Sequence, residues 1–307
     1  MADTLKLQDE QLRARLAPVH TGHYFTGHTY KSPPEKINPK NVRLSKPYVV
    51  CITGAGRGLG AATAVAYAQA GASGIVISSR TSSELDEVKK QILNEAPNCQ
   101  VTAQTCDVVS DASVMELVNA VEKEHGRLDV LVNNAGYLDR TGFVPLTEGE
   151  PEEFRRTMDV NVFGAYLVTR AFLPLLLNTE SGAKVVIGLS SMSSHVARYS
   201  IAMGLSKLAL NRFIEFLAVE YKNQGLMAYA LHPGSVPTKM SSHAPVNWGK
   251  FIADSPDLCG AMVVWLTKEK RPWLSGRYVA ALWDTDELEA QKDEIVEQDK
   301  LKFRMVV

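Results

Sequence analysis

From residue 47 onward, short apolar runs alternate with helix-length stretches, and this alternation constrains the fold more than any other feature of the chain. The runs are almost continuously apolar, which is typical of parallel strands that helices cover on both faces. The predicted strands are Tyr48–Thr53, Gly74–Ser78, Gln100–Thr105, Asp129–Asn133, Lys184–Ser190, Met227–Leu231 and Arg277–Ala281. The predicted helices are 60–70, 82–95, 111–125, 151–177, 200–223 and 256–268. The pattern predicts an α/β fold, a doubly wound parallel sheet of Rossmann type in one domain.

Two segments outside this pattern flank the predicted domain at 47–283. The N-terminal extension, 1–46, has no sustained period and carries eight basic against four acidic residues. The C-terminal tail, 284–307, has eight acidic against four basic residues, and Leu288 and Ile295 suggest a short helix before an extended end. The opposite charges favour packing on the body or on a neighbouring subunit. Two solvated tails are the alternative, and the sequence leaves the choice open.

Composition excludes several classes of function. A net charge of −1 gives no drive toward nucleic acid or an anionic membrane, so neither is an expected partner. No run of about 18 apolar residues is present, and residues 1–20 are too polar for a secretory signal, so we expect a cytoplasmic protein. The spacing of the four cysteines does not match that of metal ligands, so we predict buried free thiols and no metal site. They are Cys51, Cys99, Cys106 and Cys259.

A glycine-rich segment, Thr53–Gly60, reads TGAGRGLG and joins the first predicted strand to the first predicted helix. Small residues let the backbone turn tightly and approach a pyrophosphate, whose charge meets the free amides at the helix N-terminus. A glycine-rich turn alone is a modest signal, but its place in a βαβ unit strengthens it. The segment predicts a dinucleotide site.

The spacing TGxxxGxG differs from the general dinucleotide motif and resembles that of short-chain dehydrogenases/reductases. The resemblance covers about 47–283, and the tail is also similar to fungal NADP-dependent members. Asn133–Gly136 is similar to the family's NNAG segment, Asp107 to its adenine-binding aspartate, and Pro233–Thr238 to its segment beside nicotinamide. The resemblance implies a nicotinamide-dinucleotide oxidoreductase.

Cofactor choice follows from the end of the second strand. NAD enzymes usually place an acid there, which binds the ribose 2′-hydroxyl and repels a 2′-phosphate. This chain has Ser78-Ser79-Arg80 instead, and Arg80 and Arg57 suit a 2′-phosphate. We therefore predict NADP(H). The predicted cofactor-binding residues are Gly54, Arg57, Gly58, Leu59, Gly60, Ser79, Arg80, Asp107, Asn133, Ala135, Gly136, Lys207, Pro233, Gly234, Val236 and Thr238.

The catalytic positions depart from the family at one residue. The family uses a Ser, a Tyr, a Lys and a helix Asn, and the resemblance assigns these roles to Ser190, Met203, Lys207 and Asn161. Ser191 is the alternative to Ser190. Methionine replaces the tyrosine four residues before the lysine, and a thioether cannot donate a proton near neutral pH. Losing a positioned general acid costs about 10²–10⁴ in rate.

Several explanations for Met203 compete. Tyr199 lies one helical turn earlier and is the first replacement candidate, and His195 is a second. An iminium or conjugated acceptor needs no such proton. Another explanation is a redox-neutral reaction, such as cyclisation, dehydration or isomerisation. A further one is that the chain is a non-catalytic nucleotide-binding subunit. An engineered replacement of tyrosine by methionine would leave the same pattern.

Further residues suggest the substrate and the assembly. Tyr137, Asp139 and Arg140 follow the fourth strand, where they serve as acid/base groups or as a surface ion pair. The stretch 240–252 suggests a largely apolar lid, so a hydrophobic small molecule, acted on in secondary metabolism, is the predicted substrate. In the family, the helices at 151–177 and 200–223 form subunit interfaces, which implies a homodimer or homotetramer.

Overall fold

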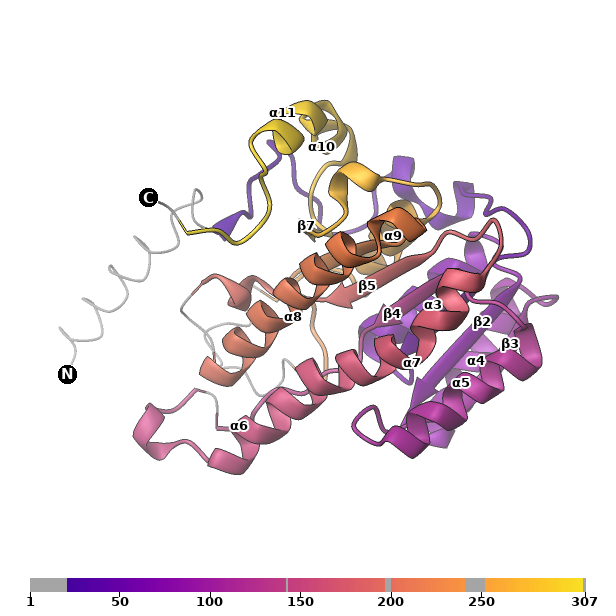
Figure 1. Ribbon diagram of the computed structural model, residues 1–307, viewed down its shortest axis with the longest axis horizontal. Coiled ribbons are helices and arrows are strands. Elements are labelled where there is room, and N and C mark those ends of the chain that lie inside the picture. The colour runs from indigo at the N-terminus through magenta and orange to yellow at the C-terminus, as the bar shows by residue number, and fades with distance from the viewer. Residues whose placement is uncertain (1–20, 142, 197–199, 241–251, 306–307) are drawn as a thin grey trace.

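A computed structural model describes residues 21–141, 143–196, 200–240 and 252–305. Its centre is a seven-stranded parallel sheet in the order β3-β2-β1-β4-β5-β6-β7 (Figure 1). The strands are β1 Val49–Thr53, β2 Gly74–Ser79, β3 Gln100–Thr105, β4 Val130–Asn133, β5 Val185–Leu189, β6 Met227–His232 and β7 Arg277–Ala280. The chain runs outward from β1 to β3 and returns to β4 on the other side of β1. In open parallel sheets, ligands bind at the carboxyl ends of the strands where the strand order reverses. The carboxyl ends of β1 and β4, called the cofactor crevice below, are therefore the expected ligand site.

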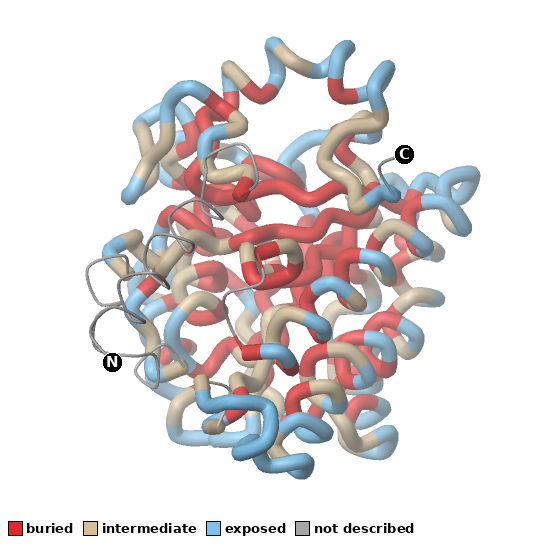
Figure 2. Tube along the Cα trace, turned by 90° about the vertical axis from the view of Figure 1, so that its left-hand side faces the viewer, coloured by how far each residue is buried: buried red, intermediate tan, exposed pale blue. Residues whose placement is uncertain are grey.

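Helices cover both faces of the sheet. One layer is formed by α3, α4 and α9, and the other by α5, α7 and α8. The bounds are α3 Gly58–Gln69, α4 Ser82–Glu95, α5 Asp111–His125, α6 Pro151–Met158, α7 Ala165–Asn178, α8 Ile201–Glu220, α9 Pro256–Thr267, α10 Thr285–Ala290 and α11 Lys292–Glu297. The central strands are buried between the layers, while exposed residues lie on the outer sides of the helices (Figure 2). The predicted doubly wound α/β fold is confirmed.

One predicted helix is not regular. The stretch 151–177 begins as α6 and continues as α7, but Asp159–Gly164 between them forms a π-helix, η4. A π-helix inserts an extra residue into the helical register and often occurs at functional sites. Periodicity does not reveal such an insertion because the apolar pattern continues on both sides of it. Its consequence is that Asn161 lies within the bulge and is buried.

The segment 151–178 is also long and apolar enough to cross a membrane by length and composition, and 44% of its most apolar window is buried in the fold. Its buried side chains include Val168, Phe172 and Leu176, which belong to the core on that face of the sheet. On the opposite side, Phe163 and Tyr166 are exposed. The apolar composition therefore reflects one buried face and one exposed face.

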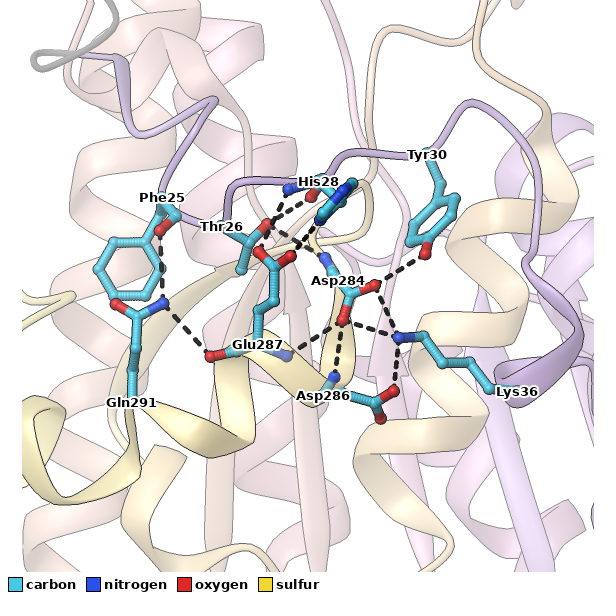
Figure 3. Close-up of polar contacts among 9 residues, drawn as sticks. All are labelled: Phe25, Thr26, His28, Tyr30, Lys36, Asp284, Asp286, Glu287 and Gln291. Atoms are coloured by element: carbon cyan, nitrogen blue, oxygen red, sulfur yellow. Dashed lines mark hydrogen bonds and ion pairs between the residues drawn. The ribbon is translucent and has the colours of Figure 1, made fainter.

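The two terminal segments pack against each other and against the body. Thr29 forms an antiparallel bridge with Trp283, whose indole Nε1 donates to the Gly22 carbonyl at 2.9 Å. The Lys36 ammonium lies 2.6 Å from Asp284 and 2.8 Å from Asp286 (Figure 3). For residues 21–46 and 284–305, packing on the body is thus observed. The predicted short helix of the tail consists of α10 and α11.

Asp284 is the centre of this contact. Its carboxylate accepts from the Tyr30 hydroxyl at 2.7 Å and from the Lys36 ammonium, and it caps the start of α10. Burial raises the pKa of this carboxyl, but hydrogen bonds from Lys36, the backbone of Glu287 and Tyr30 outweigh it and leave the pKa well below its usual range. His28 and Glu287 form a second, adjacent contact. Basic and acidic termini meet here as an ion-paired unit.

Candidate active site

The glycine-rich loop is held open for a ligand by small residues and by Asn134. The Asn134 amide donates to the carbonyls of Thr53 and Gly54 at 2.8 and 2.9 Å, which ties β4 to the loop. A Cβ on Gly60 would lie 2.5 Å from both the Asn134 amide nitrogen and the Gly54 carbonyl oxygen. Gly54 has a φ of +65°, which favours glycine. The start of α3 therefore presents its free amides to the crevice, an arrangement that fits a pyrophosphate.

Other predicted cofactor residues gather around the same crevice. Thr238 lies beside the loop, because a Cβ on Gly58 would be 3.7 Å from its methyl group. Gly234 has a φ of +93°, and the amide of the next residue donates to Asp254 at 2.6 Å. A Cβ on Gly136 would lie 3.4 Å from the side-chain oxygen of Asn161. Leu59, Ala135, Pro233 and Val236 belong to these same segments.

Two predicted residues have other local roles in this structure. Asn133 is buried and donates to Thr169 on α7 at 2.8 Å, which directs its amide nitrogen into the helix layer. Asp107 accepts from the backbone amide of Val109 at 3.3 Å, at the carboxyl end of β3. Asp107 thus fastens the turn after β3, and Asn133 supports the sheet.

The predicted 2′-phosphate site contains an acid. Arg80 is exposed after β2, as expected, but the Arg57 guanidinium forms an ion pair with Glu84 from the first turn of α4. The Cβ position of Gly56 lies 2.8 Å from the Ser79 hydroxyl and 2.9 Å from the Glu84 carboxylate. An acid does reach the end of β2, although it is five residues farther along the chain than the usual position.

Asn161, Met203 and their neighbours form the centre of the predicted catalytic group. The backbone amide of Tyr137 donates to the Asn161 side-chain oxygen at 2.7 Å. The Asn161 amide nitrogen donates to the Tyr137 carbonyl at 2.9 Å and to the Ser206 hydroxyl at 3.0 Å. The Met203 sulfur lies 3.6 Å from the same nitrogen. Met203 thus occupies a place where a tyrosine hydroxyl would meet a polar network, and it supplies no exchangeable proton.

Lys207 and Ser190 are buried next to this group. The Lys207 ammonium donates to the Leu189 carbonyl at 2.6 Å, and burial lowers the pKa of Lys207 to about 8. The Ser190 hydroxyl donates to the Asn211 side-chain oxygen at 2.5 Å. Ser191 instead caps a short turn by accepting from the Ser193 amide at 3.1 Å. The two serines therefore differ in their partners, since Ser190 contacts α8 and Ser191 caps the turn after β5.

The two replacement proton donors have different outcomes. Tyr199 lies outside the described residues. The His195 Nε2 donates to the Thr21 carbonyl at 2.8 Å, so the neutral ring accepts from Ser194 through Nδ1 at 3.1 Å. Burial lowers the pKa of His195, which favours this neutral form. The one ring proton is committed to the N-terminal segment, so His195 is poorly suited to protonate a substrate.

A cavity of about 500 Å³ lies beside the start of α8. Its lining is mostly apolar and consists of Asp139, Thr141, Val144, Leu146, Gly149, Glu150, Pro151, Phe154, Arg155, Met158, Ile201 and Ala202. The buried Asp139 carboxylate accepts from the Ser200 hydroxyl at 3.0 Å, and the same hydroxyl accepts from the Met203 amide at 3.1 Å. Ala202, which lines the cavity, directly precedes Met203 in the chain. Of the predicted lid, 241–251 lies outside the described residues.

The Tyr137–Arg140 segment does not form the Asp–Arg pair considered from the sequence. Instead, the Glu153 carboxylate accepts hydrogen bonds from the Tyr137 hydroxyl at 2.6 Å and from the Arg140 backbone amide at 2.9 Å. These hydrogen bonds, from Tyr137 first, lower the pKa of Glu153. The Arg156 guanidinium stacks on the Tyr137 ring at 4.4 Å. Tyr137 is therefore a positioning element rather than a free acid.

Comparison with known proteins gives the family. The family model described as short chain dehydrogenase matches residues 48–247. The chain is 44% identical over 264 residues to short chain dehydrogenase mpl6 of Monascus purpureus, covering 84% of this chain and 88% of the relative. It is 40% identical over 302 residues to short chain dehydrogenase pgmD of Aspergillus terreus, covering 95% and 97%. The chain belongs to the short-chain dehydrogenase family.

Solved structures agree with this membership. A putative short chain dehydrogenase from Pseudomonas syringae has a TM-score of 0.71 and 31% identity, and the match covers 82% of this chain and 98% of that one. One from Shigella flexneri, solved in complex with NADP, has a TM-score of 0.70 and 26% identity over 78% and 98%. Members of this family are oxidoreductases of Rossmann fold that use a nicotinamide cofactor, and membership therefore supports oxidoreductase chemistry for this chain.

Three further residues have direct contacts with the site: Asn134 belongs to the predicted Asn133–Gly136 segment, whereas Glu84 and Asn211 were not predicted. Asn134 ties the glycine loop to β4, Glu84 pairs with Arg57, and Asn211 receives the Ser190 hydroxyl. Asn211 was detectable, since it lies one helical turn after Lys207 and shares its face. Glu84 was not, because no short motif relates the first turn of a helix to a loop of another βα unit.

Proposed function

We propose that this chain is an NADP(H)-dependent short-chain dehydrogenase/reductase that acts on a hydrophobic small molecule in secondary-metabolite biosynthesis, in the cytoplasm. The observation that carries this proposal is the contact between the Met203 sulfur and the Asn161 amide, beside an intact Lys207. The dinucleotide cradle and the lysine remain, and only the proton donor is replaced. The fungal relatives and the mostly apolar cavity support the substrate class.

When bound at the cofactor crevice, a nicotinamide cofactor would provide hydride-transfer chemistry. In this proposal, Lys207 would bind the nicotinamide-ribose hydroxyls, and Ser190 would orient the acceptor atom. Asn161 fixes the bulge through Tyr137 and Ser206. The Met203 sulfur accepts a hydrogen bond from the Asn161 amide and has no proton to donate, so the centre suits an acceptor that gains no proton from residue 203, such as an iminium or a conjugated system.

The test is nicotinamide oxidation by the purified chain with hydrophobic ketones, iminium compounds and quinones, followed by absorbance and by product analysis. Turnover that prefers the iminium or conjugated acceptors supports the proposal. The control is Lys207→Ala, which we expect to remove turnover. Efficient reduction of simple ketones would show that another group donates the proton.

A redox-neutral reaction in the same pocket is the second candidate, favoured by the missing proton donor at Met203. Conversion of a substrate without any change in nicotinamide absorbance supports it over hydride transfer. A non-catalytic nucleotide-binding subunit is the third candidate, and it predicts dinucleotide binding with no turnover of any compound.

We also propose a homodimer or homotetramer. The outer faces of η4, α7 and α8 expose apolar side chains, which include Phe163, Tyr166, Leu205, Phe216 and Val219. Phe163 and Tyr166 line a shallow hollow of about 370 Å³ together with Phe213. An apolar face of this kind is costly in water and is covered in stable oligomers. Light scattering of the intact chain tests it, and a monomer at micromolar concentration contradicts it.

A further inference from the structure

The cofactor crevice contains a carboxylate, Glu84, that follows both predicted arginines, Arg57 and Arg80, in the sequence. Glu84 is in the first turn of α4 and pairs with Arg57 of the glycine loop. Its other carboxylate oxygen lies 2.9 Å from the Cβ position of Gly56, where the Ser79 hydroxyl is 2.8 Å away. The carboxylate therefore covers the loop at the end of β2.

This place has a known chemical consequence in dinucleotide folds. An acid at the end of the second strand binds ribose hydroxyls and repels a 2′-phosphate. Glu84 comes from a later position but reaches the same region. Since it also neutralises Arg57, it removes one of the two positive charges expected to attract a 2′-phosphate.

We propose that Glu84 is a specificity-determining residue that narrows the preference for NADP(H) over NAD(H), an inference that rests on the proposed cofactor function. A 2′-phosphate must replace the Glu84 carboxylate on the Arg57 guanidinium, because both are anions that compete for the same donors. A ribose 2′-hydroxyl requires no such exchange and can donate to the carboxylate. The exposed Arg80 still attracts the phosphate, so both cofactors bind.

The experiment compares dissociation constants for NADPH and NADH, by calorimetry, in the unmodified chain, Glu84→Gln and Glu87→Gln. Glutamine keeps the shape of glutamate and removes its charge. Glu87 is the matched control because it lies on the same helix, is exposed, and pairs with Lys90 at 2.7 Å rather than with the loop. Adenosine 2′,5′-bisphosphate and adenosine 5′-monophosphate repeat the comparison without a nicotinamide, so the result does not depend on Met203.

We expect Glu84→Gln to increase the NADPH-over-NADH affinity ratio by about tenfold or more, mainly through tighter NADPH binding. Glu87→Gln should leave the ratio unchanged. The effect of Glu84→Gln should shrink in an Arg57→Gln background, because the exchange of partners is then lost. Thermal melts check that each variant is folded.

Two outcomes overturn the inference in different ways. If both dinucleotides bind and Glu84→Gln leaves their ratio within twofold (about 0.4 kcal/mol), Glu84 does not set the preference and the proposed function is untouched. If the unmodified chain binds neither dinucleotide nor either adenosine phosphate, the cofactor proposal itself is wrong, and the role of Glu84 is refuted with it.

Discussion

The crevice at the carboxyl ends of the strands has two halves that are built from different atoms. On the dinucleotide side, Gly54, Gly60 and the backbone of α3 form the surface, and Asn134 holds the loop through main-chain carbonyls. On the catalytic side, Asn161 of η4 and Met203 and Lys207 of α8 contribute side chains from two places in the chain. At Gly54 and Gly60, the first half has no space for an added Cβ atom. The second half depends on the functional group at the end of each side chain.

The difference explains why one half keeps the family's chemistry and the other departs from it. A pyrophosphate meets amides that every residue carries, so the loop needs space rather than a particular functional group. A proton donor must be one particular group at one position. Methionine at 203 lacks such a group but still contacts Asn161 within the fold.

Adding one methyl group to the dinucleotide half should have the largest effect. In Gly60→Ala, the new Cβ would clash at 2.5 Å with the Gly54 carbonyl, a backbone atom that cannot move away without opening the loop. We expect dinucleotide binding to fall beyond calorimetric detection and stability to fall by about 1–3 kcal/mol. Gly149→Ala is the control, because its nearest neighbour is 3.5 Å away. A Gly60→Ala protein that binds normally would refute the cradle.

Changing one functional group in the catalytic half should have the next largest effect. Met203→Tyr should increase ketone reduction by about 10²-fold or more, since it restores a general acid beside Lys207. Met203→Leu also has no proton to donate and should give no gain. Little change with tyrosine, together with ketone reduction by the unmodified chain, would mean that another group donates the proton. Tyr199→Phe is then the informative variant.

How far the sequence predicts the molecule follows the same division. The strands and helices were predicted within a few residues because apolar runs and helical periods are local signals, and the glycine loop is a contiguous motif. The π-helix at Asp159–Gly164 was not predicted, since one extra residue leaves the apolar pattern intact. Glu84 was missed because its contact with Arg57 joins two separate βα units.

The catalytic half should also respond to pH through Lys207. Burial lowers its pKa to about 8, whereas the lysine of the unfolded chain keeps its proton up to about 10.5. The unfolded state therefore binds more protons between these values, and the free energy of unfolding gains a contribution as pH rises through this window. Cofactor binding that uses the ammonium should weaken above pH 8, by about tenfold per unit at most.

Titrating NADPH by calorimetry from pH 7 to pH 9 measures this effect. Lys207→Arg provides the comparison, because a guanidinium stays charged across the range and should give a flat profile. Glycine-loop contacts contain no group that titrates there, so a slope in the unmodified chain belongs to the catalytic half. A flat profile in the unmodified chain contradicts the role given to the Lys207 ammonium.

The smallest expected effect concerns the terminal segments, which support the catalytic half through the contact of Thr21 with His195. Lys36→Met should lower the free energy of unfolding by about 1 kcal/mol, because it leaves the nearly buried Asp284 carboxylate without its ammonium partner. Lys90→Met, in an exposed pair with Glu87, should change stability by less than about 0.5 kcal/mol.

Urea unfolding gives both values, and hydrogen exchange locates the change. Faster exchange confined to 21–46 and 284–305 would show that the termini open locally while the sheet stays closed. Exchange that spreads to the loop after β5 would show that the ion pair also holds the catalytic half in place. Equal losses in Lys36→Met and Lys90→Met would contradict a special role for Asp284, because an exposed pair would then contribute as much as a nearly buried one.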